Sequence, residues 1–309
     1  MKSLRAALAI GARQNYINFS RWQPQMMSRL CAKALENGVE VEYVQKLIKR
    51  RCLVPLDRTV KNWPYPIKLY TLGRFEIVLD GEPLRFTGKV QKKPLELLMA
   101  LASFGEREVS ESHLCESLWE GAEADAAHTA LAMALHRLRK LLGDDDAVLK
   151  SDNRIRLNPK KFWVDVCAFE RTLAQIEGGT PGVSEVQRVL DLYQGSFLGE
   201  VVSAPWALTA REKLRAKFLR FAVHASNCCQ QQGRHEEALK LIDLGLEAEP
   251  LAEELYRSRM RCEAALGKRA EALSTYLRCE TMLATLLGIE PSAVTRALYQ
   301  ALRENRPLP

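Results

Sequence analysis

The sequence lacks the features that mark membrane proteins, disulfide-stapled proteins and zinc ribbons. No stretch approaches the roughly 20 uninterrupted apolar residues that a membrane-spanning helix requires. No secretory signal peptide is recognisable, and the eight cysteines contain no CxxC pair. We therefore expect a cytoplasmic protein with reduced thiols and no membrane partner.

The sequence also lacks a recognisable catalytic or cofactor-binding motif. A stretch at 81–90 superficially resembles a phosphate loop, but its glycine spacing is too long and a valine replaces the Ser or Thr that would hold magnesium. His113 with Cys115, and Cys228 with Cys229, have no second ligand pair at metal-binding spacing. We expect no catalytic residues, no cofactor and no metal, and hence not an enzyme.

Composition places the chain among globular proteins, but its net charge does not locate a nucleic-acid site. With 309 residues, 47% hydrophobic and 27% charged, the chain is long enough for about two or three domains. Of its formal charge of +7, residues 1–62 hold twelve Lys and Arg against four Asp and Glu, whereas residues 63–165 and 166–309 are close to neutral. The basic segment is either a solvated helical surface or a phosphate-binding patch.

Residues 1–58 are predicted to be helical and too small to form a core alone. The clearest amphipathic helix lies within 39–51, where apolar residues recur at helical spacing at Val41, Val44, Leu47 and Ile48. Two prolines in the stretch Trp63-Pro64-Tyr65-Pro66 disfavour helix. Residues 59–66 are therefore interpreted as a linker.

From residue 67 the pattern becomes that of a small sheet. Apolar residues alternate over 67–71 and again over 75–79, and the second run stops at the turn formed by Asp80 and Gly81. Alternation of this kind is typical of half-buried strands. We expect a small sheet at the beginning of a domain that spans 67–166.

Three helical patterns and a hairpin follow the predicted sheet. The helices are expected near residues 94–102, 110–121 and 125–142. Ser110 is a suitable N-cap for the second helix, and Gly143 a suitable stop for the third. Residues 148–157 are predicted to form a hairpin around Asp152 and Asn153, which tolerate the positive φ angles of a tight turn.

The order of sheet, three helices and hairpin resembles the winged helix-turn-helix with an N-terminal sheet that OmpR/PhoB-like output domains carry. The most specific string is HRLRKLLG at 136–143, which is similar to the end of that family's recognition helix. The resemblance covers about residues 67–166. It implies double-stranded DNA as a partner.

Beyond residue 166 the sequence is helical and repeats itself. The string at 233–239 recurs at 267–273, a spacing of 34 residues, which is the tetratricopeptide period. In the first copy, Gly245 and Pro250 occupy positions that such repeats use for close helix packing and for ending the second helix. The second copy has its proline seven residues late, at Pro291, and is interpreted as an elongated capping repeat.

A winged helix followed by helical repeats resembles the SARP/AfsR-type regulators. Further strings similar to their bacterial transcriptional activation domain stand at 192–198, 205–206, 287–291 and 296–299. The resemblance covers about three quarters of the chain and implies a transcription activator of the cytoplasm, associated with the nucleoid. It also implies that residues 167–304 form a tetratricopeptide-like domain that binds protein partners, RNA polymerase or a second copy among them.

The expected fold is therefore mainly α with one small α+β domain.

Residues 1–58 and the junction at 70–75 are more similar to the C-terminal end of large MalT-like ATP-dependent regulators. Those proteins carry an ATPase upstream. The chain is then either a natural short form or a fragment.

The third predicted helix holds the candidate DNA-reading residues. Because successive residues turn by about 100°, one narrow stripe faces the core, formed by Leu131, Leu135, Leu138 and Leu142. The opposite side and its flank then carry Thr129, Met133, His136, Arg137 and Lys140. A helix docked in the major groove presents such side chains to base edges and phosphates, and a solvated helix face is the alternative.

Two arginines of the predicted hairpin are further candidates. Arg154 and Arg156 alternate with apolar residues and so project from one face, where a wing can enter the narrow minor groove. The alternative is a charged edge that discourages strand addition. Lys89, Lys92 and Lys93 are weaker candidates for phosphate contacts, because nothing in the sequence sets their direction.

Sequence-specific regulation of transcription is thus the leading hypothesis. The main competitor is a protein-interaction scaffold whose winged helix has lost DNA binding, which the alanine-rich third helix and the near-neutral charge of residues 63–165 favour. Measuring whether the protein stays bound to DNA at moderate salt separates the two hypotheses. Only a DNA-binding protein displaces counterions from DNA and so shows an affinity that falls with salt.

Overall fold

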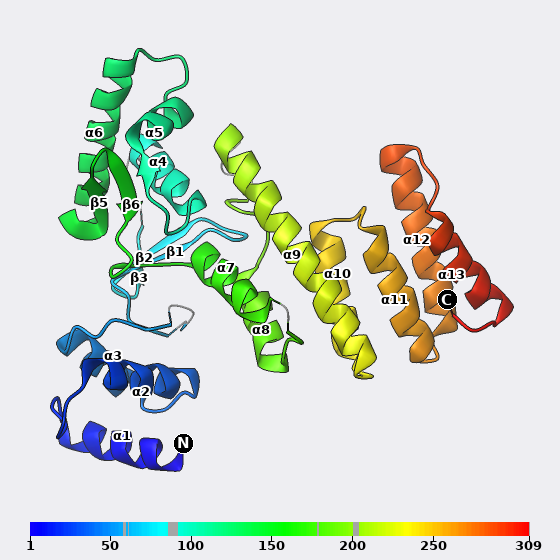
Figure 1. The fold of residues 1–309 in the computed structure, drawn as a ribbon, viewed down its shortest axis with the longest axis horizontal. Helices are drawn as coiled ribbons and strands as arrows, with labels where there is room; N and C mark the ends of the chain where they lie inside the picture. The colour runs from blue at the N-terminus through cyan, green and yellow to red at the C-terminus, as the bar shows by residue number, and fades with distance from the viewer. Residues whose placement is uncertain (58–59, 61, 86–91, 178, 200–203, 309) are drawn as a thin grey trace. The chain divides into compact units, whose positions relative to one another are not determined.

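The computed structural model describes residues 1–57, 60, 62–85, 92–177, 179–199 and 204–308 (Figure 1). The chain divides into two compact units, Met1–Thr172 with Leu198–Ala207, and Leu173–Phe197 with Leu208–Pro309. The first unit contains helices and two small sheets, and the described residues of the second are largely helical. The predicted fold class, mainly α with one small α+β domain, is confirmed.

The first unit begins with three short helices, α1 (Lys2–Gln14), α2 (Pro24–Glu36) and α3 (Val41–Arg50). In α3 the buried residues are Val44, Leu47 and Ile48, as the apolar spacing predicts. They face a small core to which α2 contributes Cys31 and Leu35. These helices therefore bury apolar side chains among themselves.

The segment interpreted as a linker is partly buried. Val60, Trp63 and Tyr65 are each no more than 3% exposed. Lys49 of α3 lies 3.7 Å from the carboxylate of Asp80 in the sheet that follows. The aromatic residues of this segment are thus packed into the first unit, although its prolines prevent helix formation.

Four strands form the first sheet, β1 (Ile67–Tyr70), β2 (Glu76–Leu79), β3 (Glu82–Pro83) and β7 (Phe162–Val164), in the order β3-β2-β1-β7. The antiparallel pair β1–β2 confirms the alternation seen in the sequence, and the turn after β2 has positive φ angles at Asp80 and Gly81. β7 pairs with β1 in parallel. β7 is only three residues long, too short for a recognisable alternation in the sequence.

The three helices of the predicted winged domain are present as α4 (Lys92–Ser103), α5 (Glu111–Leu118) and α6 (Ala124–Leu142). Ser110 caps α5 by accepting a hydrogen bond from the His113 amide at 3.3 Å. Gly143 ends α6 at a φ of 67°. α4 is buried almost all round, so it is the central helix of this domain.

The predicted hairpin is present as β5 (Val148–Ser151) and β6 (Arg154–Leu157), joined by Asp152 and Asn153, both at positive φ. A short strand, β4 (Val109–Ser110), pairs with the other side of β6, so the second sheet has the order β4-β6-β5. One 3₁₀ turn, η1 (Asp145–Ala147), connects α6 to β5. The hairpin is therefore anchored to the start of α5 as well as to the end of α6.

A buried carboxylate ties the first sheet to the helix that follows it, α7 (Asp165–Ile176). Asp165 accepts hydrogen bonds from the Thr71 amide and hydroxyl, both at 2.6 Å, and from the amides of Leu72 and Val166, both at 2.8 Å. Burial raises the pKa of the Asp165 carboxyl, and these hydrogen bonds oppose the rise. The carboxylate thus joins the end of β1 to the start of α7.

The second unit continues α7 and contains α8 (Val183–Leu192), most of α9 (Pro205–Gln231), and α10 (His235–Ala248), α11 (Glu253–Ala265), α12 (Arg269–Leu287) and α13 (Ala293–Glu304). The 34-residue repeat matches the pair α10–α11 and the start of the pair α12–α13. Gly245 lies where α10 crosses α11, and an added Cβ would come within 2.5 Å of the Leu255 side chain. This confirms the predicted close packing.

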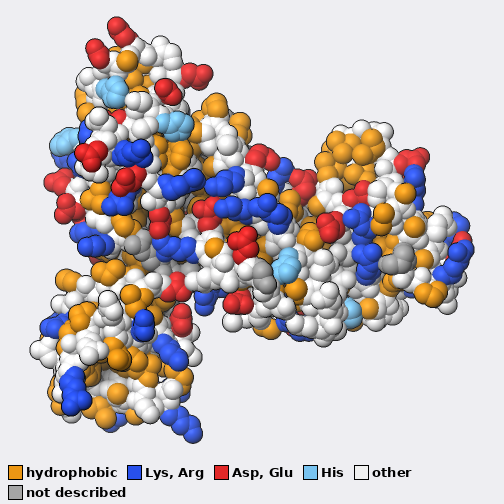
Figure 2. All heavy atoms as spheres, in the orientation of Figure 1, with side chains coloured by type: hydrophobic (Ala, Val, Ile, Leu, Met, Phe, Trp, Pro, Cys, Tyr) orange, Lys and Arg blue, Asp and Glu red, His pale blue; other side chains and the backbone are white. Residues whose placement is uncertain are grey.

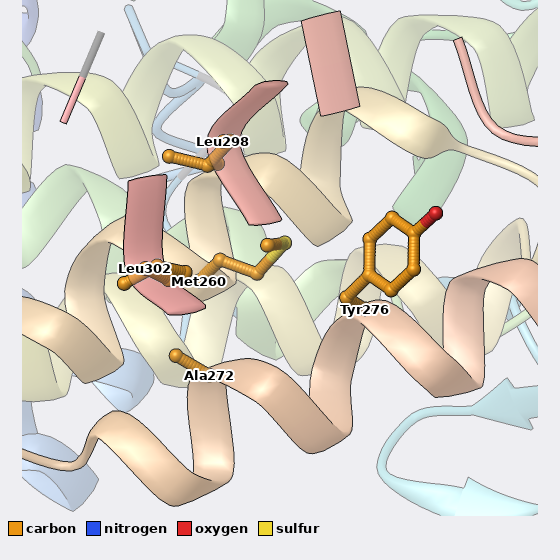
Figure 3. Close-up of a cluster of buried hydrophobic side chains, with 5 residues drawn as sticks. All are labelled: Met260, Ala272, Tyr276, Leu298 and Leu302. Carbon is orange, nitrogen blue, oxygen red and sulfur yellow. The ribbon is translucent and has the colours of Figure 1, made fainter. Parts of the chain in front are cut away.

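In the second repeat, three helices pack against one another around a cluster of buried side chains (Figure 3). Met260 of α11, Ala272 and Tyr276 of α12, and Leu298 and Leu302 of α13 are each at most 5% exposed. α12 has 19 residues against 14 in α10, which confirms that the last repeat is elongated. Stacking of neighbours provides the core of such arrays.

Replacement of Asp165 by alanine should destabilise the first unit by about 3 kcal/mol or more, because buried donors each cost about 1–3 kcal/mol when they lose their acceptor. Asp165→Asn keeps one acceptor oxygen and should lose less. Urea unfolding of the full chain measures both. Equal stability of wild type and Asp165→Ala would contradict the role given to this carboxylate.

A fragment spanning residues 167–304 should fold alone as an all-helical domain, because its repeat buries a continuous core between neighbouring helices. Circular dichroism and thermal unfolding test this. Appreciable strand content, or the absence of a cooperative transition, would show that the fragment depends on the rest of the chain.

Candidate nucleic-acid interface

The core-facing side of α6 is the one that the sequence predicts. Leu131, Leu135, Leu138 and Leu142 are each at most 6% exposed. Their neighbours at helical spacing, Ala127 and Ala134, are buried as well. The rotation of α6 about its own axis is thus set by burial of this stripe.

The five residues predicted to read DNA all lie on the exposed part of α6: Thr129, Met133, His136, Arg137 and Lys140. Met133 is 49% exposed, which is unusual for so large an apolar side chain. The Thr129 hydroxyl donates to the Asp125 carbonyl at 2.9 Å, within its own helix. The structure therefore brings these residues together on one solvent-facing surface, which we call the α6 face.

The β5–β6 hairpin lies beside α6 (Figure 1). Ile155 and Leu157 point into the core, as predicted, and Arg154 is exposed beside the two-residue turn. Arg156 is half-buried, and its Nε lies 3.5 Å from a carboxylate oxygen of Glu108. β6 is the middle strand of its sheet, so the alternative that its arginines guard a free edge does not apply.

Arg139 has a structural role that sequence analysis missed. Its Nε and Nη2 donate to the Val148 carbonyl at 3.2 and 2.7 Å. Val148 is the first residue of β5, so this side chain connects the last turns of α6 to the hairpin. In the sequence, the only indication of this role is the position of Arg139 around the axis of α6, between the buried stripe and the α6 face.

A second connection lies at the C-terminal end of α6. Lys161 Nζ donates to Asp144 Oδ2 at 2.7 Å, and Asp144 Oδ1 accepts from the Asp146 amide at 2.9 Å. The Asn158 amide group donates to the Asp146 carbonyl at 2.8 Å. The hydrogen bond from Lys161 lowers the pKa of the Asp144 carboxyl, while burial opposes it. These bonds hold η1 against the segment between β6 and β7.

A third connection uses Glu111, a buried acidic residue at the start of α5. Lys150 Nζ of β5 lies 2.6 Å from Glu111 Oε1, and His128 Nδ1 of α6 lies 3.8 Å from Oε2. Glu111 thus links both elements of the candidate interface to α5. No local pattern in the sequence indicates this group, because its members are far apart along the chain.

The lysines at the start of α4 fit a structural role better than a phosphate contact. Lys93 donates to the Leu118 carbonyl at 2.7 Å, lies 2.9 Å from Glu96, and sits 5.4 Å from the centre of the Trp119 ring. Lys92 is exposed, 3.7 Å from Glu96. Lys89 lies outside the described residues.

Within the described ranges, the structure places no three His, Cys, Asp or Glu side chains together as a metal site. Over the same ranges, every helix is too short or too polar to span a membrane.

Comparisons with known proteins bear on both units. Residues 164–303 match the family model of the bacterial transcriptional activator domain. The regulatory protein AfsR of Streptomyces coelicolor is 27% identical over 248 residues, which are 78% of this chain and 24% of AfsR. The chain thus spans about a quarter of the length of that relative.

Two further relatives are of more similar length. The transcriptional regulatory protein MoaR1 of Mycobacterium bovis is 23% identical over 256 residues, 78% of this chain and 81% of MoaR1. The structure of Mycobacterium tuberculosis EmbR in complex with a low-affinity phosphopeptide aligns with a TM-score of 0.62 at 21% identity, over 79% of this chain and 67% of EmbR. The likeness to EmbR supports the fold, and the matches together confirm the predicted resemblance to SARP-type regulators.

The Asp144–Lys161 pair should make a small, pH-dependent contribution to stability. Because the pKa of Asp144 is lower in the folded state, the contribution is complete above the unfolded value of about 4 and is lost as the pH falls through the folded value. Asp144→Asn should therefore cost about 0.5–1 kcal/mol at pH 7 and less at pH 3, since the pair is partly exposed.

Urea unfolding at the two pH values measures the difference, with the exposed neighbour Asp145→Asn as control. A cost for Asp144→Asn that is the same at both pH values would contradict the ion pair.

Proposed function

We propose that the chain regulates transcription by binding double-stranded DNA through α6 and the β5–β6 wing, because residues 164–303 match the bacterial transcriptional activator domain and the chain is similar to regulators of the SARP type. The observation that carries the proposal is the α6 face. It gathers five exposed side chains beside a hairpin that two connections hold in place, and a third connection holds the turn after α6. A recognition helix and a wing need this fixed relation to reach adjacent grooves.

The residue types of the α6 face suit base reading and backbone contact. Arg137 has the paired donors that guanine O6 and N7 accept, and the Thr129 methyl and Met133 suit the methyl group of thymine. Lys140 and His136 are proposed to contact phosphates. In the wing, Arg154 is the better candidate for the minor groove, because Arg156 faces Glu108.

The proposal extends to the organisation of the whole chain. We divide it into a helical segment (1–58), a linker (59–66), a DNA-binding domain (67–166) and a tetratricopeptide-like activator domain (167–304). The last contacts protein partners, with RNA polymerase among them, and the DNA-binding role implies a cytoplasmic, nucleoid-associated protein. Activation is the proposed direction of regulation, since the matched family is named for it.

The leucine stripe leaves one side of α6 free for DNA, which makes the proposal testable by two substitutions. Arg137→Ala should weaken binding to the preferred site by about 1–3 kcal/mol and change binding to random DNA little, because a base contact is lost. Lys140→Ala should weaken binding to all sequences nearly alike and lower the salt slope by about one unit, because a phosphate contact is lost.

Fluorescence anisotropy of the full chain at several salt concentrations measures both effects, on a site obtained by selection from random DNA. Lys240→Ala, an exposed lysine of α10, controls for the loss of one positive charge. If both variants keep the affinity of the wild type and its discrimination between the preferred site and random DNA, the scaffold hypothesis is favoured. The exposed alanines Ala126 and Ala132 of α6 are consistent with that hypothesis.

A further inference from the structure

The positive charge of the chain is concentrated in residues 1–57, which contain α1, α2 and α3 and which we call the head. The head holds ten Lys and Arg against four Asp and Glu. Residues 63–165, which contain α6 and the wing, hold fifteen against sixteen. Figure 2 shows Lys and Arg side chains spread over the head, with few Asp or Glu side chains among them.

Four cations of the head form two pairs of like charge, Arg29 with Lys33 in α2 and Lys46 with Arg50 in α3. All four residues are exposed. The members of each pair are four residues apart, so their side chains are neighbours on the helix surface and repel each other. In the described part of the chain, none of the four is ion-paired with a carboxylate. The head thus keeps two like-charge pairs that no acidic side chain neutralises.

The requirements of the helices themselves do not account for these pairs. Cations stabilise the last turn of a helix, where they face unpaired carbonyl groups. Lys33 and Arg50 stand in such turns, but Arg29 and Lys46 stand before them. The core of the head is formed by other side chains, among them Leu35 of α2 and those on the buried side of α3. The two pairs are therefore available to a negatively charged partner.

Contacts inside the head fix the helices that carry the pairs. The guanidinium of Arg51, directly after α3, lies 4.3 Å from the centre of the Trp22 ring, which precedes α2. The Tyr43 hydroxyl of α3 donates to the Tyr16 carbonyl at 2.7 Å, beyond the end of α1. A surface whose charges are fixed in advance binds a regular partner with a smaller loss of entropy.

The head belongs to the same compact unit as α6 and the wing. Gln45 Nε2 of α3 donates to the Asn62 carbonyl at 2.9 Å, just before the first sheet. Lys49 contacts Asp80 directly after β2. The charge of the head is therefore carried by the unit to which the candidate DNA-reading residues also belong.

We propose that the head contacts the phosphate backbone of double-stranded DNA through its two like-charge pairs. The inference rests on the proposed function, in which α6 and the wing select the site. Contacts between cations and phosphates supply most of the affinity that does not depend on sequence. Residues 63–165 have no excess of positive charge for this purpose, whereas the head has one. The near-neutral charge of residues 63–165 is then no argument against DNA binding.

An anionic membrane fits the head less well than DNA does. A helix that lies in a lipid surface needs a free apolar side to enter the headgroup region. In α3 that side is buried, since Val44, Leu47 and Ile48 pack into the core of the head. The exposed cations can thus meet phosphates from outside, which is how proteins contact the DNA backbone.

The salt dependence of DNA binding by the full chain tests the proposal, on the preferred site and on random DNA. Lys46→Gln with Arg50→Gln should lower the slope of log K against log salt by about one to two units, because each phosphate contact contributes about 0.9 unit. Affinity at low salt should fall roughly tenfold on both DNAs, with unchanged discrimination. Arg29→Gln with Lys33→Gln should act alike. Lys46→Glu with Arg50→Glu should weaken binding further, because repulsion replaces attraction.

The matched control is Lys240→Gln with Lys268→Gln, which removes two exposed lysines from the second unit and should leave the slope unchanged. Circular dichroism checks that the variants keep the fold. Slopes equal to that of the wild type in both Gln variants of the head would overturn the inference. So would a control variant that lowers the slope as much as they do.

Two further measurements separate this inference from its alternatives. Arg137→Ala in the same assay shows independently whether α6 reads the site, so either proposal can fail while the other stands. Co-sedimentation with vesicles that contain phosphatidylserine tests the membrane alternative. Vesicle binding that the head variants lose, with their DNA binding unchanged, would overturn the inference in favour of a lipid surface.

Discussion

The Asp165 carboxylate is the constraint on which the first unit depends. It accepts four hydrogen bonds at a point where β7 ends and α7 begins, and three of the donors belong to Thr71 and Leu72, more than ninety residues earlier. Because β7 also pairs in parallel with β1, the first sheet is completed by residues that follow the β5–β6 hairpin in the chain. The donors would be unsatisfied without this acceptor, so the carboxylate stabilises the junction between the first sheet and the first turn of α7. Any change in this carboxylate therefore affects both the first sheet and the start of α7.

The candidate interface depends on burial at one side and polar connections at the other. Four leucines set which side of α6 is turned to solvent, while Arg139, Glu111 and Asp144 hold the hairpin and the helix end in place. None of these three polar groups lies on the α6 face itself. The face can thus vary in sequence without loss of the scaffold that presents it, which is how related winged domains can read different sites.

Elements with a long, regular pattern could be predicted from the sequence, and those that depend on distant partners could not. The leucine stripe, the Ser110 cap, the hairpin turn at Asp152 and the elongated last repeat all follow from local spacing. β7 is too short to show a period, and it forms only because β1 is available to pair with it. The contacts of Lys93 likewise depend on Trp119 and Leu118, which no local pattern places beside it. The exposed residues of the α6 face could be located in advance, but their roles on DNA are set by a partner that the chain does not contain.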